Sequence, residues 1–225
     1  MKEKMIVRIA SCLCIVLMAG GTAFAQQGKK TSGPYQGPMM PLVMAPDAPD
    51  AVFYTNFEAN TCTGCNYSSA NGFLLLGPNN CYPPFAGATQ WLAYPFVSTR
   101  TGNVRRVTLA ITDWSICTPT SHQFSVAIYT DACGMVPGTQ IGNVVKANAA
   151  PAPCGTASAN FANAGVSLTA GNKYWVVVTL NNTAQQNATT AVWWETNPAE
   201  GGFNLNDGNG WVAGPTGAPG AFSVQ

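Results

Sequence analysis

From residue 51 onward, turn-forming residues divide the chain into short apolar runs at intervals of about 8 to 12 positions. The runs are rich in β-branched and aromatic residues, which favour strands. In 107–111 and 124–129, apolar residues alternate with small or polar ones. This period of two places one strand face in a core and the other nearer to water. No window of about 11 residues after the leader shows a helical stripe.

These patterns predict an all-β fold built from antiparallel strands. Residues 174–180 are apolar on both faces, as expected for a central strand. A chain of this length built from short strands favours a β-sandwich, most simply of the jelly-roll type. We expect residues 51–225 to form a single domain with this fold.

The first 25 residues have the pattern of a signal peptide. Lys2, Lys4 and Arg8 precede an apolar run over 9–19, and Ala23-Phe24-Ala25 matches a cleavage site. The run is too short for a transmembrane helix, which needs about 20 residues. We therefore expect cleavage after Ala25, export to a secreted or extracellular location, and no transmembrane segment after cleavage.

Residues 26–50 contain five prolines and three glycines, and this composition is typical of a flexible linker. The whole chain has 10 basic and 9 acidic residues. The leader holds three of the basic residues and one acidic residue, so seven basic face eight acidic residues after cleavage. Because this balance offers no polyanion-binding surface, we expect no nucleic-acid partner.

Six cysteines remain after the leader. An even number in an exported chain predicts disulfide bonds. Of the 15 connectivities that six cysteines allow, we favour one pairing, Cys133 with Cys154, because these two residues bracket one strand-turn-strand segment. The predicted disulfide cysteines are Cys62, Cys65, Cys81, Cys117, Cys133 and Cys154.

Several segments between about residues 85 and 200 resemble the choice-of-anchor domains of secreted bacterial proteins, closest to the R type. The most specific match is the Leu-Thr-Ala-Gly turn at 168–171, which leads into Tyr174-Trp175. The other matching segments are 90–96, 104–111, 126–131 and 134–138. The resemblance implies a β-sandwich displayed outside the cell, in proteins that carry varied C-terminal anchors, and the chain is expected to be either associated with the cell surface or freely secreted. It implies no biochemical activity, because none is established for the family.

The residues needed for catalysis are sparse. His122 is the only histidine, and no nucleophile elbow, zinc-protease motif or phosphate loop occurs. A glycoside hydrolase needs two facing carboxylates, and Glu195, Glu200 and Asp207 are the candidates. We expect the pKa of Glu195 to be raised by its aromatic neighbours. The prediction is nevertheless a protein that is not an enzyme, with the hydrolase as an alternative.

A binding module fits the composition better. All six tryptophans follow the leader, and exposed aromatic rings can stack on sugars. Trp193 and Trp194 are strand neighbours, so we expect their rings on opposite faces, one in the core and one outward or beneath a loop. The predicted ligand-binding residues are Trp114, Trp194 and Trp211. The predicted partner is a glycan or a cell-surface molecule, and the alternative is a structural role in a surface fibre or matrix.

The segment 204–210 is rich in oxygen ligands and faintly resembles a calcium loop. Asp207 is its one carboxylate, and Glu58 is a candidate second ligand. A structural calcium is the only cofactor that the sequence leaves open, and the competing interpretation is an Asn-Gly turn.

Overall fold

A computed structural model describes residues 51–57, 67, 71–115, 122–133, 136–151, 154–180, 190–196, 203–214 and 219–225. Within these residues every regular element is a strand, and all named strand pairs are antiparallel. The predicted all-β, antiparallel class is therefore confirmed. The described part of the chain contains no helix that meets the length and hydropathy needed to span a membrane.

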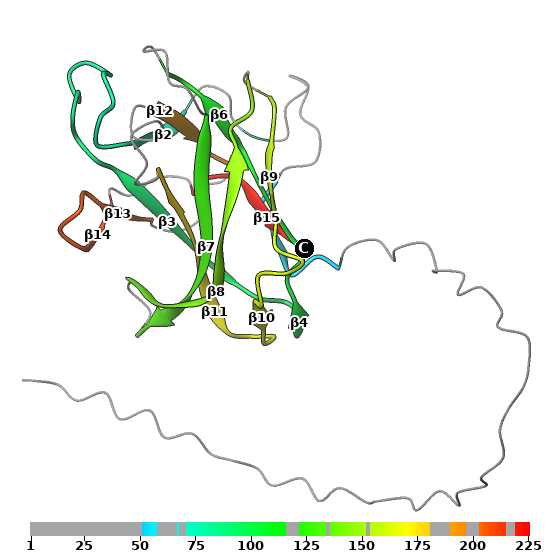
Figure 1. The fold of residues 1–225 in the computed structure, drawn as a ribbon. Helices are drawn as coiled ribbons and strands as arrows, with labels where there is room; N and C mark the ends of the chain where they lie inside the picture. Colours follow the sequence, from blue (N-terminus) through cyan, green and yellow to red (C-terminus); the bar gives the residue numbers. More distant parts are fainter. Residues whose placement is uncertain are drawn as a thin grey trace, which may run out of the picture. The chain divides into compact units, whose positions relative to one another are not determined.

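The largest sheet has six strands and includes the two longest strands of the described chain, β7 and β8, which lie side by side in Figure 1. Its strands, in spatial order, are β14 (Trp211–Ala213), β13 (Asn204–Asn206), β3 (Trp91–Val97), β11 (Lys173–Thr179), β7 (Gln123–Ala132) and β8 (Val136–Asn148).

Three smaller sheets complete the described structure. The four-stranded sheet consists of β1 (Tyr54–Thr55), β15 (Phe222–Val224), β5 (Arg106–Leu109) and β9 (Ala157–Asn160). The three-stranded sheet consists of β2 (Gly72–Leu76), β12 (Thr190–Trp194) and β6 (Ile111–Asp113). The third sheet is the pair β10 (Ser167–Leu168) and β4 (Gly102–Asn103).

One apolar core joins these sheets. The rings of Tyr94 on β3 and Trp193 on β12 meet edge to face, with centroids 4.5 Å apart. Phe96 on β3 meets Phe222 on β15 with centroids 5.9 Å apart. The inner face of the six-stranded sheet therefore packs against both the three-stranded and the four-stranded sheet.

The segment 104–111, taken above as one run, belongs to two sheets. Its first part is β5, and the chain then passes at Ala110 into β6. Ala110 is fully buried, and its N–H donates to the Ala221 oxygen while its own oxygen accepts from the N–H of Trp194. A small side chain suits this position, because the backbone bonds to two different strands there.

Burial on β7 also differs from the alternating prediction. Phe124, Val126 and Ile128 lie in the core as expected, but Ser125 and Ala127 on the opposite face are also buried. A second cluster of apolar residues on that outer face provides cover. Its members are Ala93, Trp175 and Val177, with Tyr129 and Trp211 packed against them.

The predicted bond between Cys133 and Cys154 is wrong. The two residues do not bracket a short turn, because the whole 13-residue strand β8 lies between them. The ten residues of β7 pair with β8 from end to end, and at about 3.3 Å per residue they separate the two ends of β8 by about 30 Å. A disulfide needs Cα atoms only about 4.4 to 6.8 Å apart. The structure accordingly does not join these two cysteines.

Candidate functional site

Two of the three tryptophans predicted to bind ligand lie together. Trp114 follows β6 and is 42% exposed, whereas Trp194 on β12 is buried. Their ring centroids are 5.9 Å apart, and the planes meet at 77°. The Nε1 of Trp194 donates to the Thr112 Oγ1 at 2.8 Å. The hydrogen bond to Thr112 therefore holds the buried Trp194 ring in place, and the exposed Trp114 ring packs against it.

A polar pair stands next to Trp114 in the chain. The Nδ1 of His122 lies 2.9 Å from the Oδ2 of Asp113, and the His122 side chain is about half exposed. The sequence did not predict this contact, because Asp113 and His122 are nine positions apart in the chain. Two backbone bonds hold the pair, since Asp113 N–H donates to the Ala150 oxygen and Ala149 N–H donates to the His122 oxygen.

Ser115 stiffens the same end of β6. Its Oγ donates to the Thr190 oxygen at 3.2 Å and accepts from the Thr190 N–H at 3.1 Å. Its own N–H donates to the Oδ1 of Asp113 at 3.2 Å. We call Thr112, Asp113, Trp114, His122 and Trp194 the Trp114 end. Its polar groups bond to one another and to the backbone, so the exposed ring stands in rigid surroundings.

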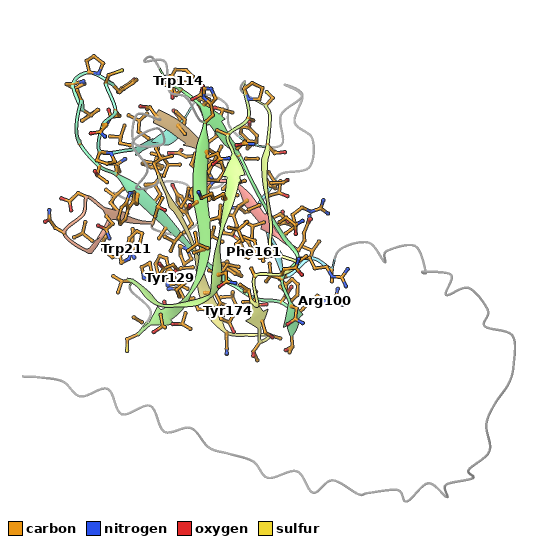
Figure 2. The ribbon with its side chains drawn as sticks, viewed as in Figure 1. Arg100, Trp114, Tyr129, Phe161, Tyr174 and Trp211 are labelled. Carbon is orange, nitrogen blue, oxygen red and sulfur yellow. The ribbon has the colours of Figure 1, made fainter. Side chains whose placement is uncertain are left out.

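Trp211 is not part of this end. It lies on β14 and packs against the outer-face cluster around Trp175. Figure 2 shows Trp211 near Tyr129 and well away from Trp114. The three predicted ligand-binding tryptophans therefore do not form one platform.

Trp193 and Trp194 do face opposite sides of β12, because Trp193 joins the main core and Trp194 joins a separate apolar cluster, distinct from the outer-face cluster around Trp175. We expected one of the two rings to face outward or to lie beneath a loop. The outward orientation is wrong, since both rings are buried. The reason is that β12 lies between β2 and β6, and its second face is also covered. Val192 of β12 shares this face with Trp194, and the residues packed with them are Phe57, Tyr67, Leu74, Ala110 and Ala221.

The acidic candidates do not gather in the described residues. Burial raises the pKa of Glu195, as its position after two tryptophans predicted. Burial, and then the charge of Glu195, raise the pKa of the fully buried Tyr94 well above its usual value. Asp207 lies on the exposed β13–β14 turn, apart from this environment. Glu200 lies outside the described residues, so the second acid of a hydrolase pair remains a prediction.

The predicted calcium loop forms a turn that satisfies its own oxygens. The Oδ1 of Asn206 accepts from the N–H groups of Gly208 and Gly210, and the Oδ1 of Asp207 accepts from Asn209 N–H. Glu58 lies outside the described residues. Across the parts that are described, no three His, Cys, Asp or Glu side chains are placed to hold a metal ion.

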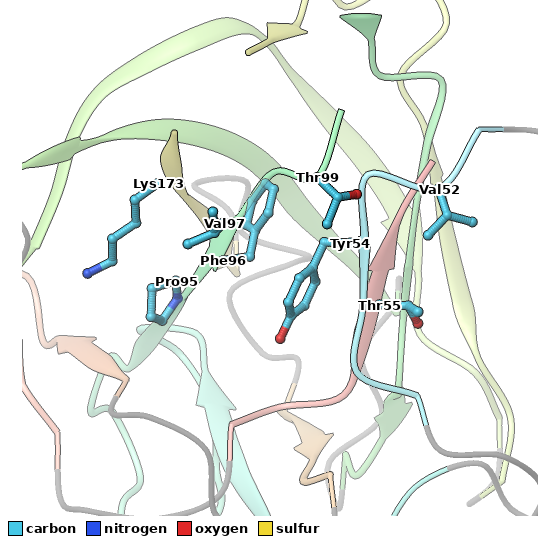
Figure 3. A pocket seen from close by; sticks show the side chains of 8 residues that line it. All are labelled: Val52, Tyr54, Thr55, Pro95, Phe96, Val97, Thr99 and Lys173. Atoms are coloured by element: carbon cyan, nitrogen blue, oxygen red, sulfur yellow. The ribbon is translucent and has the colours of Figure 1, made fainter. Parts of the chain in front are cut away.

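A groove of about 680 Å³ opens between β1 and β3, and no sequence pattern predicted it. Figure 3 shows its lining side chains spread in a row, with Lys173 at one side and Val52 at the other. The lining residues are Val52, Tyr54, Thr55, Pro95, Phe96, Val97, Thr99 and Lys173. The sequences of β1 and β3 do not predict that the two strands lie side by side, because they belong to different sheets.

No family model, curated protein or solved structure matches this chain.

Proposed function

We propose that this chain is a non-catalytic, exported binding module that holds a glycan, free or on a cell surface, at the Trp114 end. The observation that carries the proposal is the half-exposed ring of Trp114, supported edge-on by Trp194 and adjacent in the chain to the Asp113–His122 pair.

The chemistry of sugars explains why this arrangement suits them. A pyranose has an apolar C–H face and a rim of hydroxyl groups. An exposed indole offers a flat apolar surface for the first, and a carboxylate and an imidazole offer hydrogen bonds to the second. Because Trp194 and Thr112 hold the support in place, little side-chain entropy is lost on binding.

The proposal includes a specific type of β-fold. We interpret the packing of the six-stranded sheet on the three- and four-stranded sheets as a β-sandwich of the jelly-roll kind. Disulfides would strengthen it, and the disulfide-bonded state of Cys81 and Cys154 supports this view. Secretion and the resemblance to choice-of-anchor domains complete the proposal and rest on the sequence patterns alone.

The hydrolase alternative retains one supporting observation, the raised pKa of Glu195. A general acid needs such a shift, but glycoside hydrolysis also needs a second carboxylate facing it. Turnover of a glycoside by the purified protein, lost in Glu195→Gln, would favour this alternative over the binding module.

A glycan array with the mature protein tests the proposal, followed by titration of any hit. Trp114→Ala should abolish binding, while Trp114→Phe should retain part of it because a smaller ring still stacks. Phe85→Ala is the matched control, since Phe85 is an exposed aromatic outside this end. Absence of any glycan hit would refute the proposal, and loss of binding in Trp211→Ala alone would move the site to the outer face of the six-stranded sheet.

A further inference from the structure

The β1–β3 groove is a second site, distinct in chemistry from the Trp114 end. Its floor is made by Tyr54 and Phe96, whose ring centroids are 5.5 Å apart. Val52 and Val97 form exposed apolar walls, being 42% and 51% accessible. A volume of about 680 Å³ lies in the range of small-molecule sites.

We propose that this groove binds a fatty acid, that is, a single carboxylate on an extended apolar chain. The elongated row of mainly apolar side chains in Figure 3 suits a flexible hydrocarbon chain. Burying such a chain against Tyr54, Phe96 and Val97 supplies most of the binding free energy, because the hydrocarbon chain and the groove both remove apolar surface from water.

Lys173 selects the charge of the head group. Its stem lines the groove, and its Nζ lies 5.0 Å from the centre of the Trp175 ring. The Oδ1 of Asp131 is 3.5 Å from this Nζ and also accepts a 2.7 Å hydrogen bond from Trp175 Nε1. A lysine ammonium has three donors, so it can add a carboxylate to these contacts. Because the Lys173–Asp131 pair is neutral overall, a head group with one negative charge meets less repulsion from Asp131 than a doubly charged phosphate does.

A peptide strand is the competing occupant, and Pro95 argues against it. The pairing of β13 with β3 covers only Trp91 to Ala93, so the rest of β3 forms a sheet edge on that side. Strand addition depends on backbone hydrogen bonds along such an edge. Pro95 lies in this stretch and has no N–H to donate, a common way for edge strands to resist pairing.

Calorimetric titration of the mature protein with decanoate tests the proposal, with decanol and decyltrimethylammonium as neutral and cationic analogues. We expect saturable 1:1 binding of decanoate, weaker binding of decanol and the weakest binding of the cation. Lys173→Met retains the apolar stem and should weaken decanoate about fivefold while leaving decanol unchanged. Val97→Asp should abolish binding of both, because it places a carboxylate in the apolar wall.

Lys146→Met is the matched control, because Lys146 is exposed on β8 and does not line the groove. Thermal unfolding of each variant checks that the fold is intact. Failure of decanoate to saturate, or equal affinity in wild type, Lys173→Met and Val97→Asp, would overturn the proposal. Binding of a short alternating Val–Thr peptide without binding of decanoate would also overturn it, and would identify the groove as a strand-docking edge.

Discussion

The two proposed sites lie at opposite ends of β7 and would recognise their ligands by different means. His122 immediately precedes the strand and belongs to the Trp114 end, while Asp131 near its other end contacts Lys173 beside the groove. Nine residues of extended chain separate them by about 30 Å. At the first end, polar side chains bond to one another and hold a single ring in place. At the second, apolar walls dominate and one ammonium group supplies the charge.

This difference teaches that the number of aromatic residues is a poor guide to a binding surface. Trp175, Trp193 and Trp194 are buried, and Trp91 and Trp211 are partly buried. Only Trp114 presents a large exposed face among the tryptophans. The groove, in contrast, contains no tryptophan in its lining and has a volume of about 680 Å³. Whether an aromatic ring can bind a ligand depends on how far the surrounding residues bury it.

The largest expected effect separates the two rings of the Trp114 end. Trp194→Ala should lower the free energy of unfolding by about 3–5 kcal/mol, because it leaves a cavity and removes the partner of Thr112. Trp114→Ala should cost about 1 kcal/mol or less, because the ring is half exposed. Urea denaturation measures both. Equal losses of stability would mean that Trp114 is a packing residue like Trp194, which would contradict its assignment as an exposed binding residue.

A smaller effect is expected at the groove end. Asp131→Ala removes the acceptor of Trp175 Nε1, and we expect a loss of about 1–2 kcal/mol in the free energy of unfolding. Asp131→Asn keeps an oxygen acceptor and should lose less than half of that. Thermal unfolding compares the two variants. If they were equally destabilised, the charge beside Lys173 rather than the hydrogen bond to Trp175 would be the main contribution of Asp131.

A still smaller change is expected at the polar pair. His122→Ala removes a contact whose histidine is about half exposed, so the free energy of unfolding should fall by less than about 1 kcal/mol. Glycan affinity should fall more clearly, because the imidazole and the ordered Asp113 carboxylate would both be lost to the ligand. A loss of stability with unchanged glycan affinity would show that the Asp113–His122 pair only stabilises the end of β6 and does not contact the ligand.

Local patterns in the sequence predicted the strand content well. Period-two alternation in 124–129 and two-sided apolar character in 174–180 are properties of single strands, and both appear as buried strands. The opposite orientation of Trp193 and Trp194 follows from the same backbone geometry. The raised pKa of Glu195 was also predictable, since its neighbours in the chain make burial expected.

Features that depend on pairs of distant strands were not predictable. The burial of Ser125 comes from the outer-face cluster, and that cover includes Trp211, more than 80 positions away in the chain. The groove joins β1 to β3 across two sheets, and nothing in either segment encodes the meeting. The wrong pairing of Cys133 had a local cause, because the long strand β8 was taken for a strand-turn-strand segment.

The carboxylates of Glu195 and Asp207 offer the same comparison between a buried and an exposed group. Burial raises the pKa of Glu195, so its stabilising contribution is complete below the usual pKa of a glutamate and is lost as the pH rises through the folded-state value. Hydrogen bonds from Asn209 lower the pKa of Asp207, so its contribution is present at neutral pH and is lost as the pH falls.

Urea denaturation at pH 4 and pH 7 should therefore give effects of opposite sign. Glu195→Gln should gain stability relative to wild type at pH 7, by less than about 1 kcal/mol, and almost none at pH 4. Asp207→Asn should lose a little stability at pH 7 and less at pH 4. A neutral-pH loss in Glu195→Gln would mean that the carboxylate has a stabilising charged partner, and its neighbourhood would then resemble the bonded Trp114 end rather than a desolvated interior.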